Sequence, residues 1–283
     1  MKNVLLSSAT AALLICLPCF AVEGYAGGFS PTPGARTSAV VRYDGPNFGG
    51  LRLVAQLPPE LPQRVTGFAY DGEKFWAAVY LGRGRYATLN PSTLGWDVSG
   101  SEKHHGAIRE VSGAFASPGG IVFDGSKLWV GGAYGESLGC IDTQKWDVTH
   151  LYKGRYREHR GSQSYSGLAH DGSNLWVAWH WLNYRIPAAR TQLLLKLDPE
   201  TGKVAAEYPL PPGKSTDMTH GLTWDGTRLW HMKGNKLSSI DPADGRVFAQ
   251  YVVPQIKRAS GLAWDGSSLW IAEFDGKVWR LPF

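Results

Sequence analysis

Cysteine is scarce in this chain of 283 residues, which contains only three. Cys16 and Cys19 lie in an apolar N-terminal stretch, and removal of that stretch would leave Cys140 alone. A single cysteine excludes an intramolecular disulfide. The sequence shows no cysteine-histidine arrangement around Cys140, so we interpret this residue as a small buried side chain rather than a nucleophile.

Long apolar runs are also missing, except at the N-terminus. A lysine precedes a mostly apolar stretch over residues 4–20, and small residues follow it, as in a secretory signal peptide. The stretch is short for a stable membrane span. We therefore expect an exported protein, periplasmic or secreted, with no membrane span after cleavage of the signal. The expected divisions are 1–26 as signal peptide and flexible start, 27–38 as lead-in and 39–283 as one folded domain.

The common catalytic signatures are absent as well. The chain has no His-Glu-x-x-His, no Gly-x-Ser-x-Gly and no glycine loop of the phosphate-binding kind. No enzyme class therefore follows from a motif, and no cofactor is expected.

What the chain does contain is one phrase used five times. It reads GLAWDGSSLWIA at Gly261, and related phrases begin at Gly67, Gly120, Gly167 and Gly221. Apolar residues predict a first strand, Asp-Gly predicts a tight turn, and Leu-Trp opens an apolar second strand. Hairpins that are apolar on both faces must bury one another.

The spacing of the phrase predicts a β-propeller. The turn aspartates are separated by 53, 47, 54 and 40 residues, which suits a four-stranded blade. A second phrase with an Asp-Pro turn, as in LSSIDPADGRVFAQYVV from Leu237, predicts the outer two strands. Over 39–283 we expect an all-β, five-bladed propeller of antiparallel blades, five being favoured over six. The N-terminus is expected to supply an outer half-blade, and the C-terminus a hairpin, with or without a third strand, that completes the same blade. Residues 39–44 are a candidate for an extra strand.

This arrangement places the short Asp-Gly and Asp-Pro turns on one face, named here the turn face. The long, dissimilar connections fall on the other, named the loop face. They carry fourteen of the 29 lysines and arginines, including Arg155 and Arg157, against about seven acids. The turn face is predicted to be acidic. A basic loop face favours an anionic glycan, peptide or protein ligand, although solvated charge is an equally simple interpretation. A nucleic acid is not an expected partner.

The tryptophans divide into two groups. Five recur at one repeat position, and a second position holds Tyr70, Phe123, Trp224 and Trp264, so both positions are interpreted as packing between blades. Trp179 and Trp181, with His180, Asn183, Tyr184 and Arg185, instead fill an insertion that no other blade has. These residues are a candidate ligand site for a sugar ring or a stacked cation, or they cap a neighbouring loop.

Histidines raise the question of catalysis. His220 precedes the repeat glycine, where it is expected at the channel mouth, and is a candidate for ligand binding and, with Glu273, for catalysis. His231 occupies a position that is apolar in the other blades, which favours a hydrogen-bonded core histidine. His220, His231 and Glu273 together are a weak candidate set for a metal, and without diagnostic spacing none is assigned.

The repeated GLxWDGxxLW followed by LxxIDPxxGxV resembles secreted and periplasmic propellers of the quinoprotein-like type. Among five-bladed members it is similar to the glutaminyl cyclases, which implies that scaffold over nearly the whole mature chain. The first-blade Gln-Gly-Leu and the Glu expected from that family are here Thr66-Gly67-Phe68 and Ala77. Two hypotheses therefore stand: an exported binding propeller that uses its loop face, or a glutaminyl-peptide cyclotransferase-like enzyme acting at the channel mouth.

Overall fold

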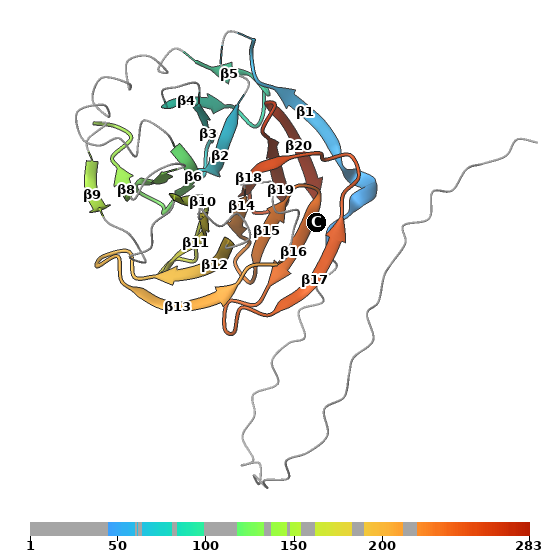
Figure 1. Ribbon diagram of the computed structural model, residues 1–283. Helices are drawn as coiled ribbons and strands as arrows, with labels where there is room; N and C mark the ends of the chain where they lie inside the picture. Colours follow the sequence, from blue (N-terminus) through green and yellow to red (C-terminus); the bar gives the residue numbers. More distant parts are fainter. Residues whose placement is uncertain are drawn as a thin grey trace, which may run out of the picture. The chain divides into compact units, whose positions relative to one another are not determined.

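Five four-stranded antiparallel sheets form a ring in the computed structural model (Figure 1). In each sheet the innermost strand is the one that precedes the Asp-Gly turn. The structure describes residues 45–59, 61, 64–80, 84–98, 118–132, 137–145, 148–153, 162–182, 190–211 and 220–283. The all-β, five-bladed propeller predicted from the repeat is confirmed. No helix in these described ranges is long and apolar enough to cross a membrane.

The blades follow one another along the chain, and each is listed from the inner to the outer strand. Blade 1 contains β2 (Val65–Tyr70), β3 (Phe75–Tyr80), β4 (Gly84–Leu89) and β5 (Trp96–Asp97). Blade 2 contains β6 (Pro118–Phe123), β7 (Leu128–Gly132), β8 (Ser137–Ile141) and β9 (Val148–Lys153). Blade 3 contains β10 (Ser162–His170), β11 (Leu175–Leu182), β12 (Arg190–Leu197) and β13 (Val204–Pro209). Blade 4 contains β14 (Gly221–Trp224), β15 (Leu229–Lys233), β16 (Lys236–Ile240) and β17 (Val247–Val252). Blade 5 contains β18 (Ala259–Trp264), β19 (Ser268–Glu273), β20 (Lys277–Pro282) and β1 (Arg52–Gln56).

The two ends of the chain share blade 5, as predicted, and of the two divisions left open by the sequence the structure has the one with a third C-terminal strand. The C-terminus supplies three strands, and the N-terminus supplies only the outermost strand, β1, preceded by a single 3-10 turn, η1 (Phe48–Gly50). The third strand of the blade is β20, which pairs with both β19 and β1. The bond from Gln56 Nε2 to the Asp275 carbonyl, at 3.0 Å, adds to this seam. The strand predicted over residues 39–44 lies outside the described residues, as do the predicted signal peptide and lead-in.

A single aspartate in each repeat phrase organises the hairpin. In blade 3, Asp171 Oδ1 accepts the backbone N–H groups of Ser173 and Asn174, and Oδ2 accepts the indole N–H of Trp176 at 2.8 Å. The same three bonds recur at Asp71, Asp124, Asp225 and Asp265. The following glycine has a positive φ in every copy, for example +94° at Gly172, which a side chain would strain. The phrase therefore fixes the turn and the tryptophan orientation together.

The repeated tryptophans pack between successive blades, which confirms that interpretation. Each lies in the apolar cluster that its blade forms with the next: Trp76 between blades 1 and 2, Trp129 between 2 and 3, Trp176 between 3 and 4, Trp230 between 4 and 5, and Trp270 between 5 and 1. Because each cluster joins two blades and the ring is closed, the core is continuous around the axis.

The repeat glycines let the inner strands approach closely. A Cβ added at Gly120 would lie 2.8 Å from Cα of Gly167, and one at Gly167 would lie 2.9 Å from the His220 carbonyl. Gly67, Gly221 and Gly261 meet the next blade in the same way. These five residues are named here the glycine ring. Only glycine fits at this distance between backbones.

Candidate functional site

Polar side chains gather at the loop-face end of the interface between blades 3 and 4. Blade 3 contributes Ser166, His180 and Gln192, and blade 4 contributes His220, His231, Lys233 and Ser238; this set is named here the histidine cluster. The three imidazoles are between 1% and 3% exposed, and Lys233 is 4% exposed. In the other blades, the position of His231 holds Ala77, Val130, Val177 or Ile271, so the cluster breaks the repeat.

The three imidazoles are in mutual contact. His220 Nδ1 and His231 Nε2 are 2.8 Å apart, and their ring centroids are 5.1 Å apart. His180 stacks on His220 with a centroid distance of 5.8 Å. His180 reaches this position because it lies near the end of β11 and faces blade 4, on the same side of the strand as Ala178 and Trp176.

Hydrogen bonding assigns the tautomer of His180. The Ser166 hydroxyl donates to the Ala178 carbonyl at 3.1 Å, so its oxygen is left to accept the N–H of His180 Nδ1 at 3.4 Å. The proton of the neutral imidazole is then on Nδ1, and Nε2 carries a lone pair. This Nε2 atom is buried and has no hydrogen-bond partner among the described residues. It is therefore available as an acceptor or as a base.

The pair of His220 and His231 can be protonated in two equivalent ways. One ring donates to the other, and the outer nitrogens, His220 Nε2 and His231 Nδ1, have no partner among the described residues. If His220 donates, its Nε2 is a lone pair and His231 Nδ1 is an N–H; if His231 donates, the roles reverse. The pair therefore always presents one donor and one acceptor, and it can pass a proton from one end to the other.

Burial keeps all three imidazoles neutral. It lowers the pKa of His180 to about 4 and that of His231 to about 3, and the Lys233 charge adds to both effects. The pKa of His220 lies well below its ordinary value because of burial and then because of its neighbours His231, His180 and Lys233. A neutral cluster beside a lysine repels a further proton but attracts an anion.

Two amide side chains connect the cluster to the outer strands. Lys233 Nζ donates to Gln192 Oε1 across the blade interface at 2.8 Å, and Gln250 Nε2 donates to Ser238 Oγ at 3.1 Å. The first bond directs the ammonium group toward blade 3, on the side of the sheet that carries His231. The lysine and the imidazoles are thus held in one site by both blades.

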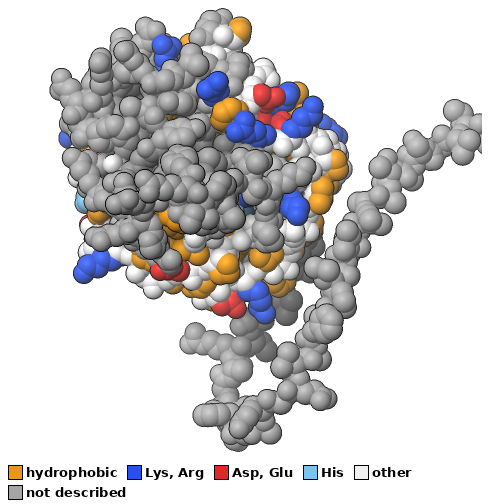
Figure 2. Space-filling view, viewed as in Figure 1, with side chains coloured by type: hydrophobic (Ala, Val, Ile, Leu, Met, Phe, Trp, Pro, Cys, Tyr) orange, Lys and Arg blue, Asp and Glu red, His pale blue; other side chains and the backbone are white. Residues whose placement is uncertain are grey.

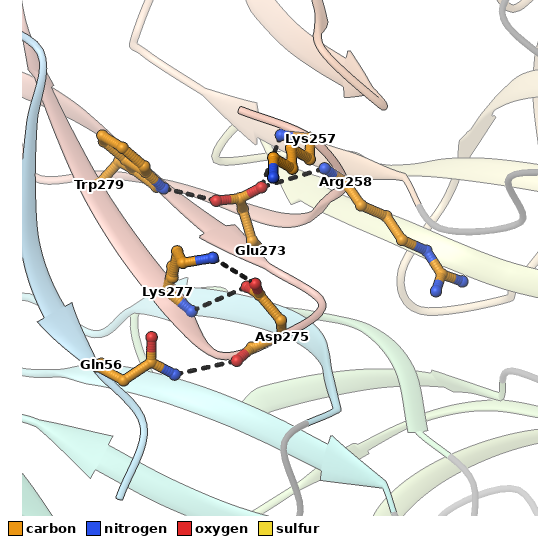
Figure 3. Close-up of polar contacts among 7 residues, drawn as sticks. All are labelled: Gln56, Lys257, Arg258, Glu273, Asp275, Lys277 and Trp279. Atoms are coloured by element: carbon orange, nitrogen blue, oxygen red, sulfur yellow. Dashed lines mark hydrogen bonds and ion pairs between the residues drawn. The ribbon is translucent and has the colours of Figure 1, made fainter. Parts of the chain in front are cut away.

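Glu273, which the sequence groups with the two histidines, is bound elsewhere (Figure 3). Its Oε1 accepts the backbone N–H groups of Lys257 and Arg258 at 2.6 and 3.1 Å, and its Oε2 accepts the Trp279 indole N–H at 2.7 Å. Glu273 lies on β19 on the side that faces blade 4, whereas His231 faces blade 3. Glu273 and His231 are therefore on opposite sides of the blade 4 sheet. Within the described part of the chain, no group of three or more His, Cys, Asp or Glu side chains is arranged to hold a metal ion.

The described residues of the predicted blade 3 insertion face two different blades. His180 faces blade 4, and the two tryptophans face blade 2. Trp179 and Trp181 lie on β11 rather than in a loop, and both pack toward blade 2. The Trp179 ring is 1% exposed and donates to Gln163 Oε1 at 3.1 Å, so it is a core residue. Trp181 is half-buried at the edge of that core. The remaining predicted ligand residues, Tyr184, Arg185, Arg155 and Arg157, lie outside the described residues.

Several members of the cluster do not follow from the sequence. The sequence places His180 in a loop insertion, because β11 is longer than its counterparts, and it gives Lys233, Gln192 and Ser238 no role. The available indication was the phrase LWHMK, in which a histidine and a lysine two residues apart share one side of a strand that is apolar elsewhere. Gln192 gave no indication, because its contact with Lys233 depends on the position of a neighbouring blade.

Cys140 is buried, as predicted, but it does have a histidine neighbour. Its Sγ lies 3.0 Å from Thr149 Oγ1 and 3.7 Å from His150 Nδ1, which is directly opposite on β9. Burial raises the pKa of the Cys140 thiol above its ordinary value despite the Thr149 hydrogen bond. The group is therefore a thiol at neutral pH, which agrees with a packing role.

Comparison with known proteins supports the fold of the chain. No protein-family model matches it, and no curated protein sequence does. Among solved structures, it is similar to glutaminyl cyclase from Myxococcus xanthus, with a TM-score of 0.54 and 10% identity over 82% of this chain and 95% of that one. A virginiamycin B lyase from Staphylococcus aureus matches with a TM-score of 0.42 and 15% identity over 74% of this chain and 62% of that one. A chain of a nidogen/laminin complex matches with a TM-score of 0.46 and 14% identity over 74% and 72%. At 10% identity, the first of these likenesses shows the propeller fold alone.

Proposed function

We propose that the chain is an exported binding propeller that recognises an anionic ligand, such as an acidic glycan or peptide, on its loop face. The observation that supports this most strongly is the histidine cluster. A lysine and three neutral imidazoles are buried together, and one of the three, His231, stands where every other blade has an apolar residue. Burying these polar groups costs stability, so it needs a compensating role.

The chemistry of the cluster suits an anion. Lys233 supplies a fixed positive charge, and the His220–His231 pair supplies one N–H donor in either protonation arrangement. A carboxylate or sulfate oxygen could accept from both groups in a charge-assisted manner. The neighbouring sequence adds to this, because Arg185 and Lys214 fall within a few residues of His180 and His220.

Charge elsewhere on the molecule is consistent with an anionic partner. The formal net charge is +5. On the side drawn in Figure 2, Lys and Arg side chains of described residues are spread along the edge with few Asp and Glu among them. Such a distribution would increase the rate of encounter with an anion and would make it depend on salt.

The test is a calorimetric titration with glucuronate and oligogalacturonate, with glucose as the neutral comparison. Lys233→Met should weaken binding of the acidic sugars by about tenfold or more, as expected for loss of a hydrogen bond to a charged group. The control is Lys236→Met, which removes the same charge from the exposed end of the adjacent strand. Equal affinities for the parent and both variants would refute the cluster as the recognition site.

The second candidate is a cyclotransferase-like enzyme acting at the channel mouth. The lone pair on His180 Nε2 and the proton path through His220 and His231 favour it, because cyclisation of an N-terminal glutamine requires proton transfers as ammonia leaves. Incubation with a peptide that begins with glutamine should then release ammonia. His180→Gln should abolish this release without reducing the thermal midpoint by more than a few degrees. Absence of ammonia release by the folded parent would exclude this candidate and leave the binding proposal intact.

A further inference from the structure

A cavity lies on the propeller axis at the turn face. It is at the opposite end of the molecule from the histidine cluster. Its volume is about 120 Å³. Five rings from five blades line it, each directly preceding the turn aspartate: Tyr70, Phe123, His170, Trp224 and Trp264. The sequence predicts that this repeat position packs between blades. The rings do contact the blade interfaces, but each is only partly buried and also borders the cavity.

The glycine ring lies on the inner side of this cavity. The cavity is lined by residues that follow the ring along the inner strands, such as Phe68, Val122 and Leu262. At the ring itself the backbones are too close for even a Cβ. The cavity is therefore a shallow axial pocket. Its volume equals that of roughly four water molecules, at about 30 Å³ each.

The five aspartates of the repeat lie at the turns next to the pocket, because they follow the five rings directly in sequence, but none of them lines it. Burial opposes ionisation of Asp124, Asp171 and Asp265, but the backbone and indole N–H donors outweigh it, so the pKa of each lies below its ordinary value. Their charge reaches the pocket, since the pKa of Tyr70 is raised by burial and then by Asp265 and Asp71.

Nearby cations do not cancel this field at the rings. Lys74 lies over the Trp76 ring on β3 at 5.0 Å, and the Arg228 guanidinium lies over Phe248 on the outer strand β17 at 3.5 Å. Both side chains therefore extend away from the inner strands. The third cation at this turn position, Lys127, borders a different pocket, which Trp129 and Cys140 also line. Blades 3 and 5 have the neutral residues Asn174 and Ser268 at the same turn position. The mouth of the pocket keeps an excess of negative charge.

We propose that this axial pocket binds a small organic cation, a methylated ammonium group. Aromatic faces attract a cation through their quadrupole, and a ring of such faces bordered by carboxylates selects a cation over a neutral molecule of the same shape. The volume suits a trimethylammonium or tetramethylammonium group and excludes a large ligand. The group could belong to a free molecule such as choline or to a trimethylated lysine of a peptide.

The test is titration of the full chain with choline and with 3,3-dimethylbutan-1-ol, its uncharged isostere, followed by tryptophan fluorescence and calorimetry. Choline and tetramethylammonium should bind and the isostere should not. Trp224→Leu should weaken choline binding by about fivefold or more, the loss expected when one aromatic face is removed. The control is Trp96→Leu, which removes a half-buried indole from the outermost strand of blade 1, outside the pocket. A trimethyllysine peptide in place of choline distinguishes the two sources of the group.

His170 offers a variant that does not weaken the scaffold. Its Nδ1 accepts the Gly172 N–H at 3.2 Å at the exposed turn, so His170→Phe loses little and adds a fully aromatic face to the pocket. This variant should bind choline more tightly than the parent. Equal binding of choline and its isostere, or no binding of either across the millimolar range, would overturn the proposal. So would unchanged choline affinity in both His170→Phe and folded Trp224→Leu. Lys233→Met should not affect this site, so the result is independent of the loop-face proposal.

Discussion

The two faces of the blade 4 sheet carry side chains from the same strand, β15, but one face is apolar and the other is polar. On β15, Trp230 and Met232 face blade 5 within an apolar cluster, whereas His231 and Lys233 face blade 3 beside two further imidazoles. Strand alternation places these neighbours on opposite faces. The side toward blade 5 satisfies the packing requirements of the repeat, and the side toward blade 3 departs from them. Residues that depart from a repeat in this way identify a functional surface better than those that preserve it.

The side facing blade 5 should carry the largest share of stability. Trp230 is fully buried, and its indole donates to Asp225 at 2.7 Å. Trp230→Ala should therefore lower the free energy of unfolding by about 3–5 kcal/mol, as for other large core truncations. Denaturant unfolding followed by circular dichroism measures this change. A loss below about 1 kcal/mol would contradict the packing assigned to this side of the blade.

The side facing blade 3 should make the protein sensitive to acid. The histidines are neutral when folded, with pKa values of about 4 for His180 and about 3 for His231, and would titrate near 6.5 when unfolded. Because these pKa values are lowered on folding, the unfolded state takes up protons first. Stability is fully retained above pH 6.5 and falls as the pH decreases toward 4, by up to about 1.4 kcal/mol per pH unit for each histidine. Unfolding titrations between pH 7 and pH 4.5 measure this slope; a flat profile would mean that the imidazoles are solvated.

Replacing histidines on that side by the residues of another blade should increase the free energy of unfolding. The increase should be smaller than the loss expected for Trp230→Ala. The double variant His220→Ser and His231→Val introduces the residues that blade 3 has at these positions, Ser166 and Val177. It removes two buried nitrogens that lack partners among the described residues, so stability at pH 7 should increase by about 1–2 kcal/mol. The same variant should lose part of the acid sensitivity. A marked decrease in stability at pH 7 would indicate that the histidines are structural.

The local rules that build a blade are readable in the sequence, and the contacts between blades are not. The Asp-Gly turn, the aspartate-to-tryptophan spacing and the alternation of strands act within a dozen residues, so the repeat phrase predicts the five blades and the shared closing blade. The histidine cluster depends instead on which two blades each residue lies between. Glu273 occupies the same place in its strand as Lys233 and also faces the preceding blade, but that blade is blade 4, and Glu273 binds the 257–258 backbone. His180 joins the cluster only because β11 extends further than the other second strands.

The central claim is that the side of blade 4 facing blade 3 holds an anion, and the protons that accompany binding test it most directly. An anion near His220 and His231 would offset the Lys233 charge and raise the pKa of these imidazoles, so binding should be coupled to proton uptake. The measurement is calorimetric titration with oligogalacturonate at pH 5.5 in two buffers of different ionisation enthalpy. We predict net proton uptake for the parent and a smaller uptake, through His180 alone, for the double variant, which should also bind more weakly. Binding without proton uptake, and with equal affinity in the parent and the double variant, would contradict the claim.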